Sequence, residues 1–285
     1  MLLWMLNDPI IEAILLGHFP PMSLCDYSSY LAQRVYRHLS EVFSFGLSFS
    51  ELGMTDHFIL DLVRFSSRVS PATIKVYKTS WPVETAFGND IDLFVGDGTG
   101  QYDWYALQAK VMSHEGEFSD LKVKVKGELH QWHKLLLHER LFGSQAYYLL
   151  YVGKSKTNFP TTRPSKEDCQ GVAPIGDYGL SLVKALDIYK TVMRTTPMKF
   201  SEVFPDHVEP LRSIFCCPQP LPRTAKKYSE NEIASPAYRQ VYARGKGDDP
   251  YQGYTISDHV LPDGFAPLRI LIDLNPDLGK TDGSR

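Results

Sequence analysis

Features of membrane, disulfide-rich and zinc-binding proteins are scarce in this sequence. Four cysteines occur among its 285 residues, and none of them forms a Cys-x-x-Cys pair. That spacing argues against a zinc site and predicts reduced, mostly buried thiols in a cytoplasmic protein. The longest uncharged apolar run falls far short of the about 18 residues that a membrane span requires, so we expect no membrane partner.

An excess of one charge is also lacking. The 30 Lys and Arg residues nearly balance the 33 Asp and Glu residues, leaving a net charge of −3. Near neutrality does not favour a nucleic-acid-binding protein, which is often strongly basic, but a local basic groove suffices to hold phosphates. The sequence contains no internal repeat, no Gly-rich phosphate loop and no Ser/His/Asp order. Its hydrophobic content of 43% is normal for a globular protein with a substantial core.

One predicted β-hairpin carries most of the chemical information. Residues 90–96 alternate between polar and apolar, and the Asp-Gly-Thr-Gly segment at 97–100 is a strong turn signal. The second strand, from about Trp104 to Val111, alternates as well and places Gln108 and Lys110 on one face. The hairpin therefore carries acidic groups on one strand and a Gln-x-Lys pair on the other.

The register of this hairpin decides which residue faces the acid. A turn centred on Thr99 places Asp90 opposite Gln108, whereas a turn centred on Gly100 places Asp90 opposite Lys110. An acid lies beside the Gln-x-Lys pair in both registers. The alternative interpretation is an ordinary cross-strand ion pair on a solvated face of the sheet.

A carboxylate, an amide and a lysine on such apolar strands suit phosphodiester hydrolysis. A divalent cation needs hard oxygen ligands, which Asp90 and a neighbouring carboxylate can supply. The cation acidifies a water molecule and polarises the phosphate, while a lysine beside it neutralises the charge that builds in the transition state.

The same residues resemble a known active-site signature. Glu84, the Gly88-Asn-Asp90 segment and the Gln108-Ala-Lys110 segment are similar to the motif of the PD-(D/E)XK nuclease superfamily. They are closest to its Mrr-like branch, in which Gln replaces the acid of the (D/E)-x-Lys element, and to an uncharacterised bacterial family of that superfamily. The resemblance covers about residues 51–152 and extends more weakly to 178–217 and 267–274. It implies an α/β, restriction-endonuclease-like fold with a mixed central sheet flanked by helices.

The resemblance also implies a role for each matching residue. Asp90 would be the metal-binding acid, Gln108 would contribute its side-chain oxygen, and Lys110 would be the catalytic lysine. The main-chain carbonyl of Ala109 would complete the metal shell. Because an amide carries no charge, this site would hold Mg²⁺ or Mn²⁺ less tightly than a Glu-x-Lys site.

Other polar residues are candidates for the same site. The upstream acid, with both catalytic and metal-binding roles, is either Glu84 or Glu51. Asp92 either compensates for the missing charge at Gln108 or lies behind the ligands or in solvent. Gln131 matches a glutamine that recurs after Gln-x-Lys in the resembled family, and it either touches the site or caps the sheet.

Three lysines after the hairpin are candidates for contact with nucleic acid. Lys122, Lys124 and Lys126 alternate with apolar residues, so they would share one side of an extended segment. They would either line a phosphate groove or protect an edge strand from pairing.

The apolar periodicity predicts the order helix, strand, β-hairpin, helix, strand, which is an α/β core. This core would span 51–155, between an N-terminal helical extension at 1–50 and an irregular C-terminal extension at 156–285. The N-terminal helices, which include a short amphipathic helix within residues 1–20, would pack on the domain or on a second copy, giving a homo-oligomer. Predicted helices cover 26–45 with Asp26 as N-cap, 55–68 with Thr55 as cap, 128–142 and 179–194; predicted strands cover 73–79, 145–152 and 269–274.

These observations predict an Mg²⁺- or Mn²⁺-dependent endonuclease that hydrolyses phosphodiester bonds, in DNA rather than RNA. The resemblance alone suggests a setting in antiviral defence or in a mobile element. The alternative is a catalytically inactive nuclease-fold protein that serves as a nucleic-acid-binding or protein-interaction module. The near-neutral charge and the amide at Gln108 favour this alternative.

Overall fold

The computed structural model describes most of the chain between Ser23 and Leu274. The described residues are 23–68, 73–79, 87–96, 98–122, 124–125, 129–157, 159–160, 162, 164, 167–168, 171–195, 197–216, 226–233, 238–243 and 266–274. Glu84, Lys126, the side chain of Lys124 and the helix predicted within residues 1–20 lie outside this set.

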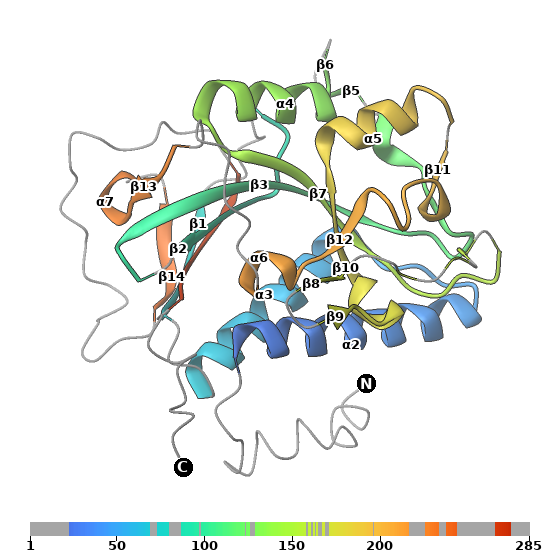
Figure 1. Ribbon diagram of the computed structural model, residues 1–285, viewed down its shortest axis with the longest axis horizontal. Coiled ribbons are helices and arrows are strands. Elements are labelled where there is room, and N and C mark those ends of the chain that lie inside the picture. Colours follow the sequence, from blue (N-terminus) through green and yellow to red (C-terminus); the bar gives the residue numbers. More distant parts are fainter. Residues whose placement is uncertain are drawn as a thin grey trace.

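Nine described strands form one mixed sheet at the centre of the molecule (Figure 1). The strand order is β12–β10–β7–β3–β2–β15–β1–β14, and β13 pairs with β3. The pairs β3–β7 and β2–β15 are parallel, and the other pairs are antiparallel. The strands are β1 Thr73–Thr79, β2 Ile91–Gly96, β3 Gln101–Val111, β7 Gln145–Tyr151, β10 Leu180–Lys184, β12 Val208–Pro210, β13 Tyr228–Ser229, β14 Tyr238–Ala243 and β15 Leu268–Asp273.

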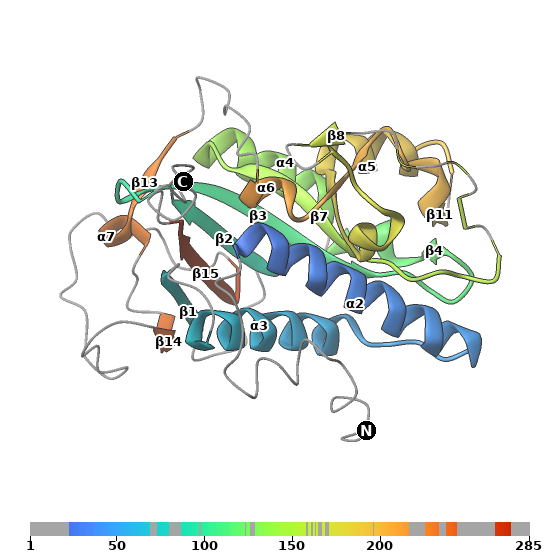
Figure 2. The ribbon, with the colours of Figure 1, turned by 60° about the horizontal axis from the view of Figure 1, so that its bottom comes forward.

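Helices cover both faces of this sheet. Figure 1 shows α4 and α5 above the sheet, and Figure 2 shows α2 and α3 lying across the opposite face. The helices are α2 Leu24–Ser44, α3 Glu51–Arg68, α4 Gln131–Phe142, α5 Ala185–Val192, α6 Ser213–Cys216 and α7 Glu230–Ile233, with 3-10 turns η2 Asp120–Lys122, η3 Ile175–Gly179 and η4 Phe200–Glu202. Three small two-stranded sheets pair β4 Glu117–Phe118 with β11 Met198–Lys199, β5 Lys124–Val125 with β6 Leu129–His130, and β8 Glu167–Asp168 with β9 Gly171–Val172.

The predicted fold class is confirmed at the level of a mixed α/β sheet flanked by helices. After Gln145, strand β7 consists of alanine, leucine and tyrosine, and these six residues are buried, as its position between two helical layers requires. Helix α3 buries Met54, Phe58, Leu62 and Phe65, which recur at helical spacing along one side. Strands β10, β12, β14 and β15 complete the same sheet, so the region after residue 156 is more regular than predicted.

Several predicted elements are confirmed by the structure. Strand β1 has the predicted bounds, and β7 lies within the predicted strand. The final strand begins one residue early, at Leu268. Gly143 ends α4 with a φ of 68°, the left-handed conformation that stops helices and that glycine adopts without strain.

Other predictions about the helices are wrong. Ser23, not Asp26, caps α2, because its side chain accepts a hydrogen bond from the Asp26 N–H. Helix α3 begins at Glu51, four residues before Thr55, since the Ser50 hydroxyl accepts a hydrogen bond from the Gly53 N–H. The helix predicted over 179–194 is divided into strand β10 and helix α5. Helix α4 begins at Gln131, because the preceding pair of residues forms β6.

The prediction of reduced cysteines is wrong for two of the four. Cys25 and Cys216 form a disulfide between α2 and α6, across a sequence separation of 191 residues. Such a separation hides the pairing from any argument based on spacing. The cytoplasmic location, which that argument supported, stays a prediction. Among the described helices, none is both long and apolar enough to cross a membrane.

Candidate functional site

The candidate site lies beside β3, just ahead of the first residue of β2. The hairpin register pairs Ile91 with Leu107 and therefore places Asp90 opposite Gln108, which confirms the turn centred on Thr99. Strand β3 continues to Val111, so its last four residues extend beyond β2. The carboxylate of Asp90 occupies this position instead of a strand.

Two hydrogen bonds join the side-chain carboxylate of Asp90 to β3. Its Oδ2 accepts the main-chain N–H of Ala109 at 2.8 Å and also accepts a hydrogen bond from the Gln108 side-chain amide. The same Gln108 Nε2 lies 3.2 Å from the Ala109 carbonyl oxygen. Gln108 is 1% exposed, whereas Asp90 is half-buried, so the cluster has a buried side and a side that solvent reaches.

Lys110 and Glu51 add an ion pair to this cluster. The Lys110 Nζ lies 2.9 Å from Glu51 Oε2, and the two side chains are 11% and 35% exposed. Glu51 reaches the site because α3 begins there, after its Ser50 cap. The structure thus brings Asp90, Gln108 and Lys110 together with Glu51. An ion pair on a solvated sheet face does not describe this largely buried arrangement.

The charge of the cluster perturbs Asp90. Burial, followed by repulsion from the Glu51 carboxylate, raises the pKa of Asp90 to about 7, although the Ala109 N–H and the Lys110 ammonium act in the opposite direction. The pKa of Tyr148, which lies on β7 and pairs with Gln108 of β3, is also raised, first by burial and then by the Asp90 and Glu51 carboxylates. A pair of adjacent carboxylates favours a bound cation, because the cation removes their repulsion.

The donor set fits a divalent cation. The Gln108 Oε1 is buried and has no hydrogen-bond partner among the described residues, so an oxygen ligand is available there. The carboxylates of Asp90 and Glu51 and the Ala109 carbonyl supply further hard oxygens of the kind Mg²⁺ prefers. Within the described part of the chain, no group of three or more His, Cys, Asp or Glu side chains is arranged to hold a metal. A cation here would therefore depend on the amide and carbonyl oxygens as well as on the carboxylates.

Asp92 does not join this cluster, so of the alternatives left open by the sequence it takes neither the one beside Gln108 nor the one in solvent. It is fully buried, and its Oδ1 accepts hydrogen bonds from Asn89 at 2.6 Å and from Trp104 at 2.8 Å. Its Oδ2 accepts the Ala266 N–H and lies 3.6 Å from the Arg269 guanidinium. Burial raises the pKa of Asp92 to about 6, against the opposing effect of Arg269. The carboxylate is thus neither solvent-facing nor near Gln108 through any hydrogen bond.

The remaining predicted residues lie around the site rather than in it. Gln131 begins α4, and its Cα lies 3.6 Å from the place that a Cβ on Gly88 would take, so it packs behind the segment that leads to Asp90. Lys122 is exposed in η2, so the predicted single extended strand is broken there. Side-chain alternation of the three lysines is therefore not preserved at Lys122.

Asn89 and Tyr148 were not among the site residues that the sequence predicted. Both side chains are fully buried next to residues of the cluster. The position of Asn89 directly before Asp90 was an available signal, whereas nothing in the sequence pairs Tyr148 with Gln108.

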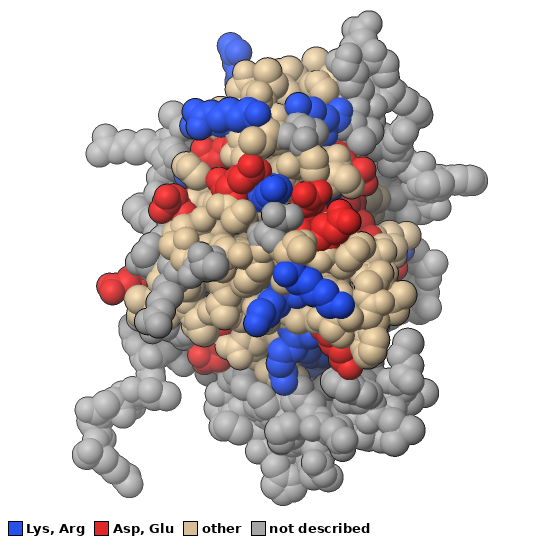
Figure 3. All heavy atoms as spheres, turned by 90° about the vertical axis from the view of Figure 1, so that its right-hand side faces the viewer, with Lys and Arg blue, Asp and Glu red and all other residues tan. Residues whose placement is uncertain are grey.

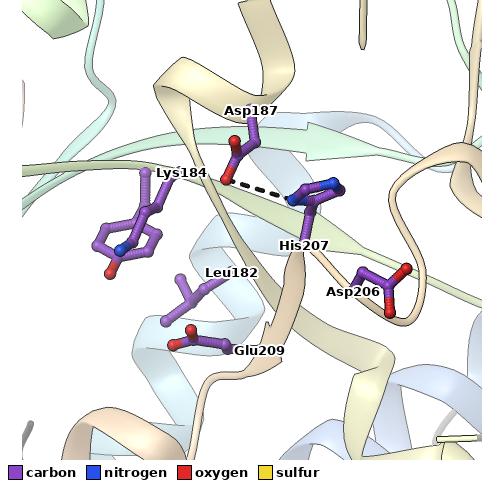
Figure 4. Close-up of a pocket in the computed structure, with 7 residues that line it drawn as sticks. Leu182, Lys184, Asp187, Asp206, His207 and Glu209 are labelled. Carbon is purple, nitrogen blue, oxygen red and sulfur yellow. Dashed lines mark ion pairs between the residues drawn. The ribbon is translucent and has the colours of Figure 1, made fainter. Parts of the chain in front are cut away.

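A separate hollow lies at the edge of the sheet (Figure 4). It has a volume of about 170 Å³, and an ion pair of 3.6 Å between His207 and Asp187 borders it. Its lining residues are Tyr147, Leu182, Lys184, Asp187, Asp206, His207 and Glu209. None of them belongs to the cluster at Asp90. On the face shown in Figure 3, acidic side chains of described residues lie between two groups of basic ones, so the described part of that face has no continuous basic strip.

The fold and the cluster define an α/β protein with a mixed central sheet, in which two carboxylates, an amide and a lysine meet beside an inner strand. The chain belongs to a family of unknown function, DUF6615, whose sequence profile matches residues 24–269. A comparison with curated proteins gave no match, and neither did a comparison with solved structures. The resemblance to restriction endonucleases therefore stays an expectation from the sequence.

Proposed function

We propose that this protein is a divalent-metal-dependent nuclease of restriction-endonuclease-like fold that hydrolyses phosphodiester bonds in DNA. The observation that carries the proposal is the meeting of Asp90, Gln108 and Lys110 with Glu51 at one half-buried place. These four groups come from β3, from the residue just ahead of β2 and from the first turn of α3. An antiviral or mobile-element setting remains part of the proposal and rests on the resemblance alone.

Each residue has a distinct part in the proposed reaction. Asp90 and Glu51 would hold Mg²⁺ or Mn²⁺, together with the Gln108 Oε1 and the Ala109 carbonyl oxygen. When bound, the cation would supply positive charge to the phosphate and lower the pKa of a water molecule. Lys110 would donate hydrogen bonds to the negative charge that develops on the phosphate oxygens. The amide of Gln108 would keep Asp90 oriented, since it already donates to that carboxylate.

Plasmid cleavage in the presence of Mg²⁺ or Mn²⁺ tests the proposal. We expect Asp90→Ala to abolish cleavage and Lys110→Ala to slow it by about 100-fold, the usual loss when a donor to developing charge is removed. Lys75→Ala is a matched control, because Lys75 pairs with Glu230 at 2.6 Å and its side chain is 15% exposed, against 11% for Lys110. Cleavage at the wild-type rate by both site variants would rule out this mechanism.

The second candidate function is a binding module that keeps the fold without catalysis. The observation in its favour is that Lys110 and Asp90 already have partners within the protein, namely Glu51 and Gln108. This candidate predicts that DNA or a protein partner binds equally well with Mn²⁺ and with a chelator. Calorimetry with Mn²⁺ separates the two, because the nuclease predicts heat of cation binding that Asp90→Ala removes.

A further inference from the structure

A buried polar network lies directly behind Asp90. Asn89 and Asp92 are both 0% exposed, and Asn89 Nδ2 donates to Asp92 Oδ1 at 2.6 Å. Asp92 is fixed in turn by Trp104, by the Ala266 N–H and by Arg269, which is also fully buried. The Asp92 carboxylate therefore gives the segment before β2 a rigid attachment point inside the core.

This attachment acts on the residue next to Asp90. Gly88, with a φ of 71°, turns the chain ahead of Asn89, and the Asp90 N–H donates to the Leu107 carbonyl at 2.8 Å. Asp90 thus lies outside the regular pairing of β2. Its backbone is held by the hydrogen bond from its own N–H to Leu107 and, through the preceding residue, by the hydrogen bond from the Asn89 side chain to Asp92. A shift of this segment would move the Asp90 carboxylate away from Gln108 and Ala109.

Burying the side-chain amide of Asn89 costs free energy, and the hydrogen bond that its Nδ2 donates to Asp92 accounts for an amide at this position. Its Oδ1 is buried without a hydrogen-bond partner among the described residues, and an unpaired buried acceptor is unfavourable. An apolar side chain would avoid that cost but would lose the bond to Asp92. We propose that Asn89 is a positioning residue, which holds the Asp90 carboxylate in its cation-binding place by anchoring the chain to Asp92. This inference rests on the proposed function, because it takes Asp90 as a metal ligand.

Trp104 offers a matched comparison within the same network. Its Nε1 donates to the same Asp92 Oδ1 at 2.8 Å, but the residue lies on β3, opposite Phe94. Trp104→Phe and Asn89→Ala each remove one hydrogen bond from one oxygen. Of these two substitutions, only Asn89→Ala releases the segment that carries Asp90.

The test measures Mn²⁺ affinity by calorimetry and thermal stability on the full chain. We expect Asn89→Ala to raise the Mn²⁺ dissociation constant by at least about 10-fold, the usual effect of losing a group that orients a ligand. Trp104→Phe should change that constant by less than about 3-fold. It should lower the melting temperature at least as much as Asn89→Ala does, since it also removes packing. Asn89→Ser, which keeps a short donor, should lie between wild type and Asn89→Ala.

The outcomes separate this inference from the proposed function. Wild-type protein that binds no Mn²⁺ would overturn the metal site itself. Mn²⁺ binding by wild type that weakens equally in Asn89→Ala and Trp104→Phe, or in neither, would overturn the positioning role alone. Failure of both Asn89 variants to fold would also overturn it, since the hydrogen bond would then serve the whole fold rather than Asp90.

Discussion

At the scale of single residues, opposing influences meet at Asp90 in the candidate site. It accepts hydrogen bonds from Ala109 and Gln108, yet burial and the neighbouring Glu51 carboxylate raise its pKa to about 7. The favourable contacts therefore do not fully compensate for placing two carboxylates together. A site that binds a cation carries such a conflict until the cation arrives.

This conflict predicts how stability depends on pH without metal. In the unfolded chain the Asp90 carboxyl loses its proton near pH 4, whereas in the folded protein its pKa is about 7. Between these values the folded state binds more protons, so the contribution of Asp90 to stability falls as the pH rises from about 4 to about 7. Asp90→Asn, which stays neutral, should gain melting temperature relative to wild type over that range.

Thermal melts at pH 4.5, 6 and 8 in a chelating buffer measure this difference. Glu51→Gln is the control, because it removes the charge that raises the Asp90 pKa and should reduce the pH-dependent part. If the difference in melting temperature between wild type and Asp90→Asn is the same at every pH, the raised pKa of Asp90 is contradicted.

The sequence predicted the residues of the site better than their surroundings. Strict alternation and the turn signal predicted an acid beside the Gln-x-Lys pair but left two registers open, and the structure selects the one with Asp90 opposite Gln108. The sequence left Glu51 and Glu84 as alternatives; the structure brings Glu51 to Lys110 because α3 begins there, and Glu84 lies outside the described residues. The position of Asp92 was left open, and the structure separates it from Asp90 because Asp90 precedes β2, whereas Asp92 lies within β2 and is buried.

At the scale of elements, short apolar runs were the main source of error. Residues 180–183, Leu-Ser-Leu-Val, fit either a strand or the first turn of a helix, and only the pairing of β10 with β7 and β12 decides for the strand. Strands with a clear turn or a long apolar run, such as β7, were predicted correctly because their local pattern fits only a strand. Local pattern sufficed where it was unambiguous and failed where tertiary pairing chose between two fits.

Close packing of η3 against α2 gives a prediction at this scale. A Cβ at Gly179 would lie 1.9 Å from the Ala32 carbonyl oxygen of α2, so Gly179→Ala must push the two elements apart. We expect a loss of about 2 kcal/mol in the free energy of unfolding, as for other overpacked sites. Gly176→Ala is the control, because its Cβ would first meet the Gln33 side chain at 3.1 Å, which can move. Urea titrations of both variants measure the difference, and equal losses would contradict the close approach.

At the scale of the whole molecule, the disulfide between Cys25 and Cys216 joins the first described helix to α6. Because it closes a loop with a separation of 191 residues, its loss should cost about 2–4 kcal/mol, mainly by releasing the unfolded chain. We expect a reductant to lower the melting temperature of wild type but not that of Cys25→Ala. Peptide mapping after alkylation should show both cysteines protected until reductant is added. Alkylation of Cys25 in the native, unreduced protein would contradict the pairing.

The position of β15 in the sheet has a consequence for how the protein is made. This strand, close to the C-terminal end of the matched family region, inserts between β2 and β1, and its Arg269 pairs with Asp92 behind Asn89. A chain still emerging from the ribosome lacks this strand, so its two sheet halves have no common neighbour and the support behind Asp90 is missing. The residues up to Asp273 must therefore be synthesised before the sheet and the support behind Asp90 are complete.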